Sequence, residues 1–143
     1  MTKPSLIPFK AEHLMMFIDR DGLFYNMKDA IHKENDGPAF TAVLGDKILG
    51  CAGIILQWQG VGTAWVVFNK DIEHYMLWAT RTIKYTLRDI KRALNLHRID
   101  MTVLEGLPKY NRWAEFLGFC IEDGRASKLT YDKQNCIRYE MVD

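Results

Sequence analysis

The sequence carries no excess charge of either sign and no long apolar run. Its 19 Lys and Arg residues nearly balance 18 Asp and Glu residues, which leaves a formal net charge of +1. No overall positive field therefore favours nucleic acid or an anionic membrane as a partner. No apolar stretch reaches the roughly 20 residues that span a bilayer. Pro8, Lys10 and Glu12 interrupt the first apolar segment, unlike a secretory signal, so we expect a cytoplasmic protein.

Cysteine is scarce, and its positions argue against two common kinds of site. The cysteines are Cys51, Cys120 and Cys136, an odd number at wide spacing within strand-like runs. This pattern suits reduced core thiols better than a disulfide framework. No CxxC pair occurs, and the four histidines are scattered along the chain, so the sequence predicts no metal site.

The pattern of apolar residues predicts a single α/β domain over residues 1–143. A chain of this length can bury one sizeable core, and neither a repeat nor a linker divides it. Alternation and turn residues predict strands over 5–9, 39–44, 47–56, 63–68, 98–104, 119–129 and 135–142. Helix-like segments cover 11–18, 26–33 and 109–117, and apolar steps of three and four predict a longer helix over 76–94.

The longest helix joins two strands, which predicts a parallel pair. Such a crossover is right-handed in nearly all proteins, with its two strands parallel. Gly45 and Asp46 suit a tight hairpin turn, so the three strands before this helix should form an antiparallel meander. The expected fold is a mixed, mostly antiparallel sheet of six to seven strands, with a central parallel pair and about four flanking helices.

This order of elements, together with the segment NLHRIDMTVLEGLPKYNRWAEFLGFCIEDG, resembles the GNAT superfamily of acyl-CoA-dependent N-acetyltransferases. A helix that ends in Leu-Gly-Phe before an acidic-Gly turn is similar to the C-terminal signature of that family. The segments GVGTAW, RWAEFLGF and IRYEMV look closest to the small GNAT-like proteins that tailed bacteriophages encode. A phage-encoded protein would act in the host cytoplasm.

The resemblance implies a site for acetyl-CoA or another acyl-CoA. In this family the pantetheine arm lies along the fourth strand, and the pyrophosphate meets the start of the next helix. The parallel strands should then diverge near Val67 and Met101 and leave a cleft between Phe68 and Glu105. Backbone donors near Val67 and Phe68 would hold the developing oxyanion. The implied cofactor-binding residues are Val66, Val67, Phe68, Asn69, Lys70, His74, Tyr75, Met76 and Arg81.

The expected phosphate loop lacks the glycines that are typical of the family. The sequence has NKDIEHYM at this place, whereas glycines usually let the backbone approach the phosphate closely. Asp71 and Glu73 put negative charge where an anion should bind, and Lys70, His74 and Arg81 would partly offset it. The sequence therefore predicts weaker acyl-CoA binding than is usual for the family.

The catalytic residues are also atypical. Many family members place a tyrosine at the position of Ala114, where its hydroxyl protonates the leaving thiolate. Tyr110 lies one helical turn earlier and would reach the same place, although the role of a packing anchor is favoured for its ring. Glu105 is the favoured general base, with an ion pair to Lys109 as its alternative role. His74 is the second candidate base.

Two functions remain open from the sequence. The first is an N-acyltransferase that acts on an amine of a small molecule or a protein, with a homodimer as its possible assembly. The second is a non-catalytic GNAT-like module in phage assembly or host-protein interaction, which keeps the fold without the cofactor. The strand-to-helix layout supports the first function, and the missing glycines and Ala114 support the second.

Overall fold

The computed structural model describes residues 3–16, 27–129 and 133–143. The strands are β1 (Ser5–Pro8), β2 (Ala39–Leu44), β3 (Lys47–Trp58), β4 (Val61–Phe68), β5 (Arg98–Leu104), β6 (Cys120–Ala126) and β7 (Cys136–Val142). The helices are α1 (Ala11–Met15), α2 (Met27–Asn35), the 3-10 helix η1 (Lys70–Tyr75), α3 (Met76–Ala93) and α4 (Pro108–Phe116). The outer ends of the two predicted N-terminal helices, residues 17–18 and Asn26, lie outside the described residues.

The strands form one seven-stranded sheet in the order β1-β2-β3-β4-β5-β7-β6. Only β4 and β5 pair in parallel, while the remaining neighbours among the described strands are antiparallel. This confirms the predicted mixed sheet with its central parallel pair. The hairpin between β2 and β3 turns at Gly45, whose φ of 60° is a conformation that glycine adopts without steric cost.

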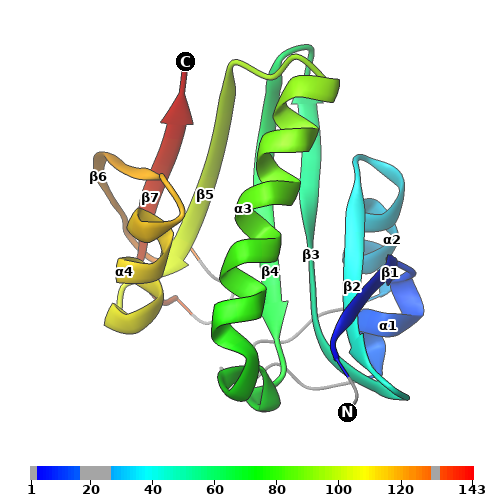
Figure 1. The fold of residues 1–143 in the computed structure, drawn as a ribbon. Coiled ribbons are helices and arrows are strands. Elements are labelled where there is room, and N and C mark those ends of the chain that lie inside the picture. The colour runs from blue at the N-terminus through cyan, green and yellow to red at the C-terminus, as the bar shows by residue number, and fades with distance from the viewer. Residues whose placement is uncertain (1–2, 17–26, 130–132) are drawn as a thin grey trace.

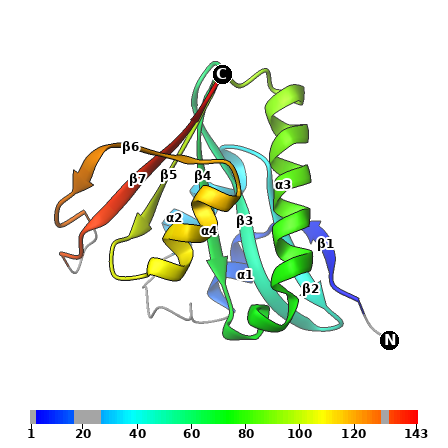
Figure 2. The ribbon, with the colours of Figure 1, turned by 60° about the vertical axis from the view of Figure 1, so that its left-hand side comes forward.

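Helices cover both faces of the sheet. Helices α3 and α4 lie on one face and α1 and α2 on the other (Figures 1 and 2). Because side chains alternate along a strand, Phe68 packs with α3 residues such as Ala79, whereas Val67 packs with Leu14 of α1 and Ala30 of α2. The fold thus gives β4 two different environments, one on each side.

The segment between β4 and α3 differs from the sequence prediction. Residues 70–75, predicted as a phosphate loop, form η1, which runs directly into α3. Of the helices that the structure describes, none is long and apolar enough to cross a membrane. Nor do His, Cys, Asp or Glu residues in the described parts of the chain gather in a group of three or more that would hold a metal ion.

Candidate functional site

A gap opens between β4 and β5. The two strands pair only from Val61 with Arg98 to Thr63 with Asp100, although β4 continues to Phe68 and β5 to Leu104. Beyond these pairs the strands diverge, as the sequence predicted, and α3 and α4 stand over the opening (Figure 1). The edge of β4 that faces β5 therefore has no strand partner over its last four residues, 65–68.

Backbone alternation decides which groups of β4 face this gap. The N–H of Asn69 donates to the carbonyl of Leu49 in β3 at 2.9 Å, and in an antiparallel pair the bonded residues alternate along the strand. Odd-numbered residues of β4 therefore bond to β3, and even-numbered residues point their N–H groups toward β5. The N–H of Ala64 belongs to the last parallel pair, Thr63 with Asp100, and faces the carbonyl of Asp100. The donors that face the gap beyond this pair are those of Val66 and Phe68. The N–H of Val67, which the sequence analysis included, points to β3.

Aromatic side chains fill the gap on the side of α3 and α4. The ring of Phe68 lies 5.2 Å from that of Trp113 and 6.2 Å from that of Tyr110, measured between centroids. Trp113 donates from Nε1 to Oγ1 of Thr80 at 2.9 Å, which ties α4 to α3. This packing leaves the backbone edge of β4 as the polar part of the gap.

Asn69 caps η1 and engages its first amides. The Asn69 side chain accepts a hydrogen bond from the N–H of Asp71 at 3.2 Å, and the Asn69 carbonyl accepts one from the N–H of Ile72 at 3.1 Å. These are the donors that a helix start would otherwise offer to an anion. Hence the N–H groups of Asp71 and Ile72 are already engaged at the place where the sequence predicts the phosphate to bind.

Both acidic residues of η1 have cationic partners. Asp71 lies 2.7 Å from Nζ of Lys47 in β3, and the hydrogen bond from Lys47 is the main reason why the pKa of this carboxyl lies below its ordinary value. Glu73 lies 3.6 Å from Nζ of Lys109 in α4, so Lys109 meets Glu73 in addition to any contact with Glu105. The repulsion that the sequence predicted for an anion is therefore partly offset.

The other residues proposed for the phosphate region fall into two groups. Lys70, His74 and Arg81 are exposed, so their side chains are available to a ligand. Tyr75 and Met76 are partly buried and pack against the cluster around Phe68.

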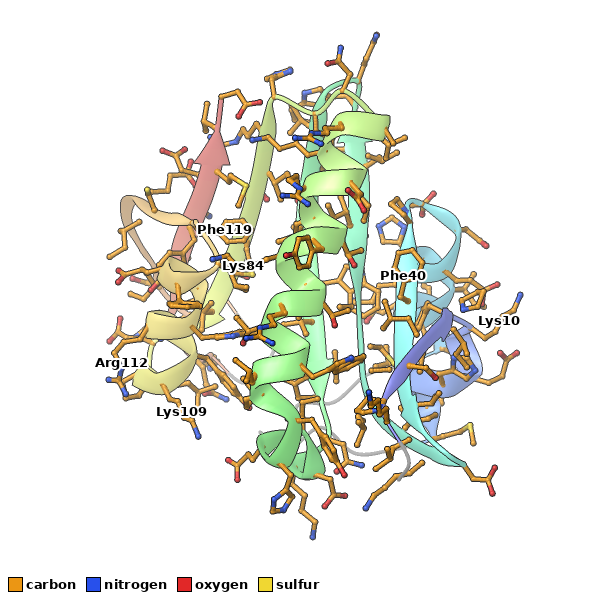
Figure 3. The ribbon with its side chains drawn as sticks, viewed as in Figure 1. Lys10, Phe40, Lys84, Lys109, Arg112 and Phe119 are labelled. Carbon is orange, nitrogen blue, oxygen red and sulfur yellow. The ribbon has the colours of Figure 1, made fainter. Side chains whose placement is uncertain are left out.

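Cationic side chains and an exposed ring lie on the outer sides of α3 and α4. Lys84 of α3 reaches across to Phe116 of α4, with its ammonium 4.7 Å from the ring centroid, and Phe116 is 65% exposed. Lys109 lies at the lower end of α4, while Arg112 points away from α3 (Figure 3). Lys84 thus contacts α4, and Lys109 contacts η1.

The candidate acid and base lie at different depths. Glu105 is exposed in the turn after β5, where its N–H donates to the carbonyl of Asn135 at 3.0 Å. Tyr110 is partly buried, and its ring takes the packing role that the sequence analysis held open for it. Ala114, one turn further along α4, is completely buried, so it has no room for a larger side chain without repacking.

The opposite face of β4 carries groups that sequence reasoning did not identify. Nζ of Lys33 in α2 lies 5.5 Å from the ring centroid of Trp65, and burial lowers the pKa of this ammonium. Nearby, Nδ1 of His13 lies 2.8 Å from Oγ1 of Thr41. Strand alternation alone would have put Trp65 on this face, but no local signal places α2 against it.

An apolar cavity of about 80 Å³ lies between α3 and the sheet. Its lining comes from four parts of the fold. From β1, β2 and β3 come Leu6, Phe40, Ala42, Gly50, Cys51, Ala52, Gly53 and Ile54; from β4 and η1 come Ala64, Trp65, Val66, Phe68 and Ile72. From α3 come Trp78, Ala79, Thr82, Ile83, Thr86, Leu87 and Ile90; from β5 onward come Met101, Trp113, Leu117 and Phe119.

Known structures share this fold over nearly the whole chain. A chimera of the spermidine N-acetyltransferase SpeG from Vibrio cholerae and hSSAT superposes with a TM-score of 0.73 at 17% identity, covering 97% of this chain and 95% of that chain. An acetyltransferase of the GNAT family from Bacillus anthracis gives a TM-score of 0.72 at 16% identity, covering 99% and 98% of the two chains. No family model and no curated protein matches the sequence. Identities this low show the fold alone, and it is the GNAT fold.

Proposed function

We propose that this protein is an acyl-CoA-dependent N-acyltransferase that acts on an amine of a small molecule or a protein. The observation that carries the proposal is the gap-facing edge of β4, where the N–H groups of Val66 and Phe68 have no strand partner. Unpaired strand donors in a narrow gap suit an extended amide chain such as pantetheine, which binds as a strand would. The shared GNAT fold supports the same reading.

The gap fits one part of acyl-CoA better than another. The pantetheine arm matches the edge of β4, whereas the amides of Asp71 and Ile72 at the start of η1 are already engaged by Asn69. The phosphates would therefore be met by side chains, with Arg81, Lys84 and Lys109 at the opening between α3 and α4. Side-chain cations hold phosphate as point charges, so this part of the ligand should respond strongly to salt.

The proposal assigns roles to Val66, Phe68, Glu105 and Tyr110. Acyl-CoA supplies an activated thioester carbonyl when it is bound. The N–H groups of Val66 and Phe68 would stabilise negative charge on the carbonyl oxygen. Glu105 would take a proton from the attacking amine, and Tyr110 or water would give one to the departing thiolate. A new C–N bond replaces the C–S bond, so the products are an amide and free CoA.

The residue assignment is tested by thiol release from acetyl-CoA across a panel of amines. Glu105→Gln should lower kcat roughly a hundred- to ten-thousandfold, as expected for loss of a general base, while acyl-CoA affinity changes little. Tyr110→Phe should have a smaller effect, because a thiolate with a pKa near 8.5 can leave unaided. Wild-type turnover by both variants would reject the assignment.

A non-catalytic module is the alternative outcome. The capped start of η1 and the Glu73–Lys109 pair favour it, because both reduce the groups available to a phosphate. The sequence resemblance to small phage-encoded proteins would then point to a structural or host-binding role in the host cytoplasm. The absence of turnover with every amine, together with the absence of CoA binding, would establish this alternative over the proposed activity.

A further inference from the structure

The lining of the apolar cavity under α3 extends to both sides of that helix. It includes Phe40 of β2 and Phe119, which lie on opposite sides of α3 in Figure 3. Small side chains of the sheet, Ala52 and Ala64 among them, face Thr82 and Thr86 of the helix across the cavity. The cavity is therefore bounded by α3 on one side and by the sheet on the other.

The cavity borders the gap between β4 and β5. Ala64, Val66 and Phe68 line it, and Val66 and Phe68 also direct their N–H groups into the gap. A group attached to a thioester carbonyl that these N–H groups hold would thus lie beside the cavity. The backbone of these β4 residues would bind the polar part of a ligand, and their side chains would contact its apolar part.

The residues that line the cavity indicate which kind of ligand it can bind. No charged side chain belongs to the described residues that surround the cavity, and Thr82 and Thr86 provide its hydroxyl groups. A polypeptide segment inserted here would bury N–H and C=O groups that need partners, and a polar ligand would lose its hydration without compensation. A saturated hydrocarbon chain needs no such partners, and apolar cavities take up ligands of this kind.

We propose that this cavity receives the acyl chain of an acyl-CoA longer than acetyl-CoA. The inference rests on the proposed acyltransferase function and adds the class of acyl donor to it. The chain enters from the gap past Val66 and lies between α3 and the small residues of β3. Each methylene that it buries contributes hydrophobic free energy, so affinity increases with chain length until the cavity is full.

The test is a calorimetric titration with CoA and with acetyl-, butyryl-, hexanoyl- and octanoyl-CoA. Affinity is expected to rise by roughly fourfold per added methylene and then level off. Ala52→Leu and Thr82→Leu fill the cavity from its two opposite walls and should abolish the rise, measured as the ratio of octanoyl-CoA to acetyl-CoA affinity within each variant. Ala93→Leu, at the exposed end of α3, is the matched control and should keep the rise.

Several outcomes would overturn the proposal. Equal affinity across the series, or a rise that persists in both filled variants, shows that the chain lies elsewhere. If CoA and every thioester fail to bind, the proposed function fails, and sodium octanoate then tests the cavity separately. Saturable octanoate binding that Ala52→Leu removes still supports a hydrocarbon site, and no binding rejects it. A dimer that Thr82→Leu dissociates would assign the cavity to a second copy of the chain.

Discussion

Asn69 determines what the junction between β4 and η1 offers to a ligand. Its own N–H donates to Leu49, its side-chain amide donates to the carbonyl of Ile48 at 3.2 Å, and its side-chain oxygen accepts from Asp71. One polar residue thus makes the contacts that fix the turn, and a side-chain cap of this kind stabilises a helix start by about 1 kcal/mol. Hydrogen bonds from Asn69 therefore hold this junction, and the glycine loop that is typical of the family is absent from it.

The cysteines differ in reactivity at the scale of single residues. Burial raises the pKa of the Cys51 thiol to about 12, so this group stays protonated and unreactive at pH 8. Cys136 is buried and Cys120 is exposed. We expect Ellman's reagent to modify one thiol rapidly in the native protein and three in denaturant. A second thiol that reacts as fast as the first in native protein would contradict the described burial.

At the scale of elements, η1 and α4 are connected across the mouth of the gap. Lys109 of α4 pairs with Glu73 of η1, and Trp113 of the same helix bonds to Thr80 of α3. The exposed ion pair contributes little stability, since such pairs give at most about 1 kcal/mol. Its main consequence is that it occupies a cation that a phosphate would otherwise use.

Glu73→Gln should therefore tighten CoA binding. The change removes a negative charge and releases Lys109, and we expect the dissociation constant to fall roughly two- to fivefold at low salt, in line with the energy of exposed ion pairs. Asp71→Asn is the matched control, because its partner Lys47 belongs to β3 and not to α4. Calorimetry at two salt concentrations measures both variants. An unchanged affinity in Glu73→Gln would show that the phosphates bind elsewhere.

For the molecule as a whole, the elements with regular periodicity were predictable from the sequence. The predicted bounds of β5 are confirmed at 98–104, and the long helix predicted over 76–94 is α3 at 76–93. Both have a clear repeat, of two residues for the strand and of three and four for the helix. The hairpin at Gly45 was predictable for a similar local reason, because its turn chemistry lies within four residues.

The remaining features depend on contacts between distant parts of the chain. Local periodicity does not predict that β7 lies between β5 and β6, since both strands of the closing hairpin have the same alternating pattern. The 3-10 helix at 70–75 forms on an Asn69 cap in a segment that family resemblance had suggested to be a loop. Lys33 and Trp65 meet because α2 packs on the sheet, and that packing is set by the whole core.

The central claim is that the edge of β4 facing β5 binds the amide chain of acyl-CoA. Nuclear magnetic resonance measures this most directly, through the backbone amide signals of isotopically labelled protein titrated with acetyl-CoA. The claim predicts large, saturable shifts for the amides of Val66 and Phe68, which face the gap. Much smaller shifts are expected for Trp65 and Val67, whose N–H groups bond to β3. Equal shifts along the strand, or no shift in any of these amides at saturating acetyl-CoA, would contradict it.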